Sequence, residues 1–285
     1  MGSSGRVVHE RKAPVAVFGP YRRLFGKLIA VDEVIDVLIV GGTWNPNGDP
    51  VTAAFAEALD PKHFRVQMVP YPADYGRRVA FADSVAVGRK ALIEAVEATP
   101  NRVVLAGYSQ GAAIAGDLAA DIGQGLYPHL EVVACALIAD PLRPQGRCIG
   151  DDPGGYGVVG QRRIENIPTY WAAAQGDPIT ALPAGNPLRL IADITAYFSL
   201  TSPEAMLRWG RSIIEVATSR QLQRWWSPAN WRTWGGAVAY ARGYLFDGRH
   251  TDDYVRHGHA RRLAEAVNRA VVEGAASGLR GSQAR

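Results

Sequence analysis

The pentapeptide Gly-Tyr-Ser-Gln-Gly, residues 107–111, decides the expected fold because of the segments on either side of it. Before it runs Arg-Val-Val-Leu-Ala (102–106), which is typical of a buried strand, and after it an alanine-rich segment (110–122) has a helical pattern. G-x-S-x-G between a strand and a helix predicts a sharp turn that holds the hydroxyl of Ser109 above the sheet as a nucleophile. A tight turn with an incidental serine is the alternative interpretation.

Apolar strands and helical segments alternate around this turn. The expected strands are 34–40, 64–69, 102–106, 131–139 and 169–174, and the expected helices are 78–98, 110–122 and a last helix over about 252–275. This order predicts an α/β fold with a central, mostly parallel sheet. The stretch 186–245 looks helical and ends in a tryptophan-rich segment, so we expect a helical insertion there. The expected organisation is an extension (1–33), a catalytic domain (34–275) and a flexible tail (276–285).

Composition excludes several classes of protein. Of the 285 residues, 47% are apolar and 20% charged, as in an ordinary folded protein rather than a disordered or fibrous one. The net charge of +4 is too diffuse to indicate nucleic-acid binding. The chain shows neither a secretory signal nor an apolar run of about 20 residues that would span a membrane. We therefore expect a monomer that is cytoplasmic when synthesised.

A serine nucleophile needs a base, and the base needs an orienting carboxylate. Among the histidines that follow Ser109 late in the chain, His250 lies in a loop-like stretch, whereas His257 and His259 fall inside the expected last helix. His250 is therefore the expected base. For the acid we expect Asp177, because a Gly-Asp-Pro turn places it at the carboxyl end of a strand.

The acid has an alternative candidate, and the residues that bind the oxyanion complete the expected site. Asp140 follows a strand too and is the rival acid, and either aspartate could instead be an Asx-turn residue that satisfies its own backbone. The oxyanion should be bound by the backbone N–H of Gln110 and by Thr43, which lies in the glycine-rich loop after the first core strand. That loop lacks the spacing of a phosphate-binding motif.

Cofactors and metals have little support in the sequence. The histidines show no zinc-binding spacing, and Cys135 and Cys148 have no companions. Cys135 is expected to be a small buried apolar residue, and we expect no cofactor and no metal.

Several of these segments together resemble the cutinase-like serine esterases of the α/β-hydrolase fold. The resemblance rests on Tyr71-Pro72-Ala73, on Ser84 and Gly88 in a helix, on the turn at Ser109 and on His250 followed by Tyr254. It covers roughly residues 34–183 and 245–272. It implies the triad Ser109, Asp177 and His250, with Gly42-Thr43 in the oxyanion loop.

Within that superfamily the chain is most similar to the lysin B esterases of mycobacteriophages. Like them, it has no cysteines around Gly176-Asp177, where secreted cutinases carry a disulfide, and it has a long segment between acid and base. The stretch 139–146 is also similar. The resemblance implies hydrolysis of the ester that joins mycolic acids to arabinogalactan, at the cell envelope during phage-mediated host lysis.

Aromatic residues suggest where a long acyl chain would bind. Trp44 follows the oxyanion loop residue, and Trp226 and Trp231 lie in the predicted insertion, so all three are candidate substrate-binding residues. Burial between insertion and core is an equal alternative for the latter two. Three other functions stay open: a cutinase-like or PE-PPE-type lipase, an acyltransferase with the same triad, and an inactive wall-binding or virion module.

Overall fold

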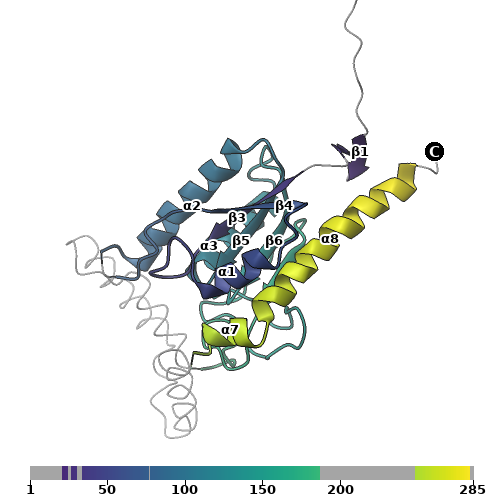
Figure 1. Ribbon diagram of the computed structural model, residues 1–285. Coiled ribbons are helices and arrows are strands. Elements are labelled where there is room, and N and C mark those ends of the chain that lie inside the picture. The colour runs from purple at the N-terminus through teal and green to yellow at the C-terminus, as the bar shows by residue number, and fades with distance from the viewer. Residues whose placement is uncertain (1–20, 25–26, 31–33, 77, 187–247, 283–285) are drawn as a thin grey trace, which may run out of the picture. The chain divides into compact units, whose positions relative to one another are not determined.

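The computed structural model describes residues 21–24, 27–30, 34–76, 78–186 and 248–282 (Figure 1). The chain divides into two compact units, one of residues 34–272 and one of residues 1–33 with 273–285. In the smaller unit, β1 (Tyr21–Leu24) pairs antiparallel with β2 (Lys27–Ala30). The sequence analysis did not predict these strands. The expected insertion at 186–245 lies almost wholly outside the described residues.

The larger unit contains a five-stranded parallel sheet in the order β4-β3-β5-β6-β7. Its strands are β3 (Ile35–Val40), β4 (Phe64–Met68), β5 (Val103–Tyr108), β6 (Val132–Ile138) and β7 (Thr169–Ala172). The predicted α/β fold with a mostly parallel sheet is confirmed. The central strand is β5, so the turn that carries Ser109 leaves the middle of the sheet at its carboxyl edge.

Helices cover both faces of this sheet (Figure 1). On one face, α1 (Pro50–Glu57), α7 (Asp252–Arg256) and the start of α8 (His259–Ser282) share one apolar core cluster with Ile35, Val37 and Ile39 of β3. On the other, α2 (Phe81–Ala98) and α3 (Gln110–Gly123) pack on Leu38 and Val40. Because successive side chains of a strand point to opposite faces, a sheet covered on both sides requires continuous apolar strands.

Helix α1 has no counterpart among the predicted elements. It begins at Pro50 behind Asp49, whose carboxylate accepts hydrogen bonds from the amides of Val51 (2.8 Å) and Thr52 (3.0 Å). The Thr52 hydroxyl accepts from the Asp49 amide in return (2.9 Å). This reciprocal cap and the proline satisfy the first amides of a helix of only eight residues, which is too short to show a clear apolar period.

The prediction of one continuous last helix is wrong. The chain forms α7 and α8, separated at Gly258, whose φ of +67° is left-handed and ends a right-handed helix. His257 and His259 therefore flank a break rather than lying in mid-helix. Helix α8 also continues to Ser282, so most of the stretch expected to be a flexible tail is helical.

The two cysteines are both free. Cys135 is fully buried in β6, where burial raises the pKa of its thiol, and this confirms its prediction as a small core residue. No helix in the described ranges is both long and apolar enough to cross a bilayer.

The turn after β5 passes unusually close to β3. A Cβ on Gly111 would lie 2.0 Å from the carbonyl oxygen of Val40, and one on Gly107 would lie 2.2 Å from that of Gly111. Neither contact can relax by a side-chain rotation, because the atoms belong to the backbone. Glycine at these two positions is therefore what allows α3 to begin against the sheet.

We expect Gly111→Ala to lower the free energy of unfolding by about 3 kcal/mol or more, because the new methyl group displaces backbone in a packed core. Gly125→Ala is the control, since a Cβ there meets nothing within 4 Å and only the φ of +83° opposes it. It should cost about 1 kcal/mol. Urea unfolding measures both, and equal losses would contradict the argument from close approach.

Candidate active site

Ser109 has a strained backbone. It lies between β5 and α3 with φ 54° and ψ −115°, a left-handed conformation that residues with a side chain rarely adopt. Such strain persists only where the surrounding structure imposes it, and it is common at functional sites. The conformation is that expected of the predicted sharp turn between strand and helix.

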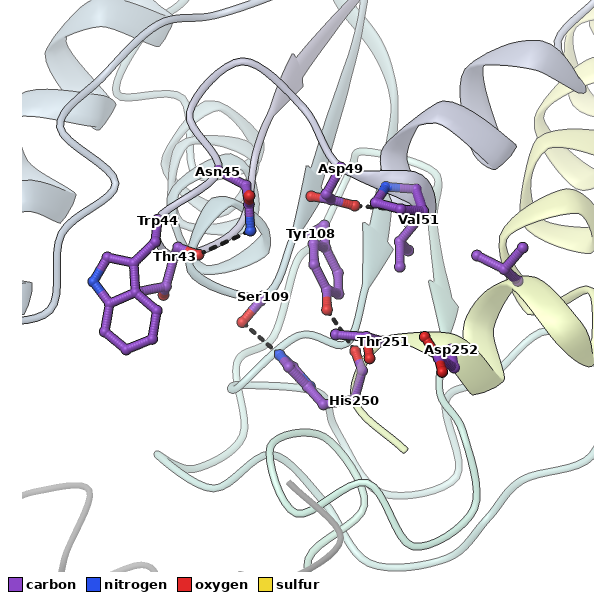
Figure 2. A pocket seen from close by; sticks show the side chains of 12 residues that line it. Thr43, Trp44, Asn45, Asp49, Val51, Tyr108, Ser109, His250, Thr251 and Asp252 are labelled. Carbon is purple, nitrogen blue, oxygen red and sulfur yellow. Dashed lines mark hydrogen bonds between the residues drawn. The ribbon is translucent and has the colours of Figure 1, made fainter. Parts of the chain in front are cut away.

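Three side chains from distant parts of the chain form a continuous hydrogen-bonded series. The Nε2 atom of His250 lies 2.8 Å from Ser109 Oγ (Figure 2), and its Nδ1 atom lies 3.0 and 3.1 Å from the two carboxylate oxygens of Asp177. All three residues are buried. The imidazole thus stands between a hydroxyl and a carboxylate, the arrangement in which it can take a proton from the hydroxyl while the carboxylate fixes its tautomer.

The turn at Asp177 requires a glycine directly before the aspartate. Gly176 has φ +76°, and a Cβ there would lie 2.2 Å from the guanidinium of Arg249. Asp177 Oδ1 also accepts a hydrogen bond from the amide of Ile179 (2.9 Å). The Asx turn considered from the sequence therefore exists, and the same carboxylate faces His250.

A buried arginine holds the loop that carries Asp177. Arg143 is fully buried, and its Nε atom donates to the carbonyl of Thr180 (2.8 Å), three residues after the acid. Its two Nη atoms donate to Asp152 (2.9 Å) and to the carbonyl of Gly154 (2.7 Å). One guanidinium thereby joins the loop after β6 to the loop after β7.

Asp140, the rival acid, has other partners. Its Oδ2 atom accepts hydrogen bonds from Arg162 Nη2 (2.8 Å) and Trp171 Nε1 (3.0 Å), and its Oδ1 atom accepts from the Leu142 amide (3.0 Å). Burial opposes the charged form of Arg162, but the carboxylates of Asp140 and Asp117 outweigh it and raise the Arg162 pKa. Asp140 therefore belongs to a buried ion pair.

The predicted oxyanion residues both lie close to Ser109, one across the shared cavity lining and one next to it in the chain. Thr43 lines a cavity of about 360 Å³ together with Ser109 and His250. Gln110 is the first residue of α3, and the amides of a helix's first turn have no acceptor within the helix, so its N–H can donate to a substrate. Its side chain is held away, because Nε2 donates to the Asp74 carbonyl (3.0 Å) and Oε1 lies 3.1 Å from the Tyr71 hydroxyl oxygen.

Three residues of the family resemblance support the oxyanion loop from behind. The Tyr71 hydroxyl donates to the carbonyl of Gly41 (2.7 Å). A Cβ on Gly88 would lie 2.7 Å from the Tyr71 ring, so only glycine lets α2 approach this tyrosine. The Ser84 hydroxyl accepts from the Asp74 amide (3.0 Å) and anchors the loop after β4 that carries Tyr71, so it supports the oxyanion loop through that tyrosine.

Trp44 stands at the mouth of the cavity beside Thr43 (Figure 2). Its side chain is 49% exposed, and its backbone is left-handed with φ 63°. The Trp44 amide donates to the carbonyl of Ala73 (2.6 Å), which holds this conformation. Trp226 and Trp231, the other candidate substrate-binding residues, lie outside the described residues. The cavity lining is Thr43, Trp44, Asn45, Asp49, Pro50, Val51, Tyr108, Ser109, His250, Thr251, Asp252 and Val255.

The aromatic residues next to the triad were not recognised from the sequence as site residues. The Tyr108 hydroxyl donates to the carbonyl of His250, and its ring stacks on the imidazole at 5.3 Å. Tyr254 donates to Asp177 Oδ2 at 2.6 Å. Apolar periodicity assigns such tyrosines to the core, and Arg143 and Arg162 look like surface charges, so no local signal identifies their contacts.

The described part of the chain contains no group of three His, Cys, Asp or Glu side chains that could hold a metal ion. The polar side chains of the cavity include one imidazole, hydroxyls, the Asn45 amide and the carboxylates of Asp49 and Asp252. The imidazole beside the Ser109 hydroxyl is suited to acyl transfer by proton movement.

Comparison with known proteins adds a family match. The family model described as Cutinase matches residues 40–174, which include the turn at Ser109 and end before Asp177 and His250. A carboxylesterase Culp6 homolog of Corynebacterium glutamicum is 31% identical over 149 residues, 43% of this chain and 48% of that protein. The chain thus spans about half the length of this curated relative.

Solved structures with a similar fold include lysin B from Mycobacteriophage D29, with a TM-score of 0.43 and 19% identity over 58% of this chain and 73% of that one. A cutinase-like protein from Cryptococcus sp. has a TM-score of 0.41 and 23% identity over 56% of this chain and 87% of that one. With the parallel sheet and the Cutinase match, the fold is that of a cutinase-like α/β hydrolase.

Two aspartate-to-asparagine variants separate the acid from its rival. Asp177→Asn should lower kcat by roughly 10⁴-fold, because an amide favours the wrong imidazole tautomer. Asp140→Asn should instead lower the free energy of unfolding by about 3 kcal/mol, since it leaves Arg162 without its most buried carboxylate, and the folded fraction should keep its kcat. Ester hydrolysis and thermal unfolding measure the two effects, and the reverse pattern would exchange the two roles.

Proposed function

We propose that this chain is a serine carboxylesterase in which Ser109 is the nucleophile, His250 the general base and Asp177 the orienting acid. The observation that carries the proposal is the hydrogen-bonded series Ser109–His250–Asp177, assembled from three separate loops. The Cutinase match and the carboxylesterase relative support the same chemistry.

The geometry gives each group a step. As Ser109 Oγ attacks the ester carbonyl, its proton moves over the 2.8 Å to His250 Nε2. The developing imidazolium is stabilised by Asp177, and the developing oxyanion by the N–H of Gln110 and by Thr43. His250 then gives the proton to the leaving alcohol, and a water molecule, activated by the same imidazole, hydrolyses the acyl-enzyme.

For the natural substrate we propose the ester between mycolic acid and arabinogalactan, cleaved at the host envelope during phage-mediated lysis by an enzyme made in the host cytoplasm. Support comes from the sequence resemblance to the lysin B esterases, in particular the long segment between Asp177 and His250. The exposed indole of Trp44 at the cavity mouth supplies apolar surface for a long acyl chain.

The deciding experiment compares wild type with Ser109→Ala on two substrates, purified mycolyl-arabinogalactan and a short-chain nitrophenyl ester. Wild type should release mycolic acid and hydrolyse the short ester, whereas Ser109→Ala should lose about 10⁶-fold in kcat on both. An unchanged unfolding midpoint in Ser109→Ala is the control for folding.

Each other outcome changes the proposal. Hydrolysis of the short ester without release of mycolic acid would keep the triad and replace the substrate by another lipid ester. Transfer of the acyl group to a sugar in preference to water would make the protein an acyltransferase. Turnover that survives in Ser109→Ala would refute the nucleophile, and binding without turnover by wild type would favour a wall-binding module.

A further inference from the structure

Asp177 has more hydrogen-bond donors than the imidazole alone. Besides His250 Nδ1, its carboxylate accepts from the Ile179 amide (2.9 Å, to Oδ1) and from the Tyr254 hydroxyl (2.6 Å, to Oδ2). Asp177 and Tyr254 are both fully buried, so solvent cannot replace a lost donor. Of these donors, only Tyr254 uses a side chain that does not take part in the proposed proton transfer.

A second contact decides the direction of the hydroxyl proton. The amide of Ala174, just beyond β7, donates to the Tyr254 hydroxyl oxygen at 3.1 Å. With that oxygen accepting from Ala174, its own proton points to Asp177, and 2.6 Å is the usual length of an O–H···O⁻ bond. Burial, and next the charge of Asp177, hold the pKa of Tyr254 well above its ordinary value, so the donor keeps its proton.

The position of Tyr254 in the chain connects it to the base as well. It lies in α7, four residues after His250, and its amide donates to the carbonyl of Thr251 (3.1 Å). Its ring lies edge-on to Tyr108, whose hydroxyl binds the His250 carbonyl. The segment that supplies the base therefore also supplies a hydrogen bond to the acid.

From this geometry we infer that Tyr254 is a positioning residue for catalysis, which orients the Asp177 carboxylate toward His250 and partly neutralises its charge. The inference rests on the proposed function, because it assigns Tyr254 to the acid of that triad. Tyr254 does not line the cavity, so its effect should appear in kcat rather than in KM.

Tyr254→Phe removes the hydroxyl and keeps the ring. We expect kcat on a short nitrophenyl ester to fall roughly tenfold to hundredfold, the effect of losing one hydrogen bond to a charged group, with KM unchanged. The acid limb of the kcat/KM profile should move to higher pH. Without the donor, the negative charge of the Asp177 carboxylate is less neutralised, which favours the protonated, inactive state of the Asp177–His250 pair.

The other titratable groups around Tyr254 need a control. Tyr108 of β5 and His259 of α8 face its ring, at 6.3 and 5.8 Å between centroids, in addition to Asp177 and His250. Burial, and next Arg262, lower the pKa of His259, and an imidazole is a group that titrates on the acid side of neutrality. His259→Gln should therefore keep the acid limb in its wild-type position.

A second control separates positioning from stability. Leu263 is fully buried in the same core cluster as Tyr254, and Leu263→Ala should lower the unfolding midpoint without moving the acid limb. If Tyr254→Phe does not fold, replacement of Tyr254 by a fluorinated tyrosine keeps ring and hydroxyl. This stronger donor should move the acid limb to lower pH, and no movement would overturn the inference.

A substrate-free measurement makes the two proposals distinguishable. In protein labelled with ¹⁵N-histidine, the Nδ1 proton of His250, assigned with His250→Gln, should change its resonance in Tyr254→Phe. The role of Tyr254 would be overturned if Tyr254→Phe left the resonance, the acid limb and kcat all at their wild-type values. It would also be overturned if the loss of activity in Tyr254→Phe were explained entirely by a lower unfolding midpoint. If Ser109→Ala kept its activity, the proposed function itself would fail, whatever Tyr254→Phe does.

Discussion

The strained turn at Ser109 is the constraint on which the rest of the site depends. Ser109 has a left-handed backbone between β5 and α3. The turn needs glycine at 111, where it approaches the backbone of β3, and at 107, where β5 approaches the first turn of α3. The parallel sheet places the carboxyl ends of β3, β5 and β7 at one edge. The loops with Thr43, Ser109 and Asp177 follow these ends, so the parallel order of the strands brings these three residues to the same edge of the sheet.

Buried polar groups keep those loops in place. Arg143 joins the loop after β6 to the loop of Asp177, and Arg162 pairs with Asp140 beneath α3. Tyr71 supports the oxyanion loop through the Gly41 carbonyl. Such groups stabilise a fold only when their hydrogen bonds are made, because an unpaired buried charge or donor costs free energy. The loops of the site are therefore specified by polar contacts, whereas the sheet beneath them is specified by apolar packing.

The two aspartates show how chemistry separates similar motifs. Asp140 and Asp177 each follow a strand and each close a short turn, but one carboxylate accepts from a guanidinium and an indole, and the other from an imidazole, an amide and a phenol. A guanidinium keeps its proton near neutral pH, whereas an imidazole can gain and lose a proton there. The partner, and not the aspartate, decides which carboxylate takes part in proton transfer.

Local pattern was sufficient for the five strands of the parallel sheet and for α2 and α3, because apolar periodicity depends on neighbouring residues. It also singled out Ser109, Asp177 and His250, whose side chains the structure brings into one hydrogen-bonded series. The sequence pattern did not predict α1, which is marked by an N-terminal capping box rather than by an apolar periodicity. It also predicted one helix where α7 and α8 are separated at Gly258. The contacts of Arg143, Arg162 and Tyr254 were decided only by the tertiary structure. Their partners lie up to 80 residues away in the chain, and a buried charge or hydroxyl has no local signature until the fold brings its partner within hydrogen-bond distance.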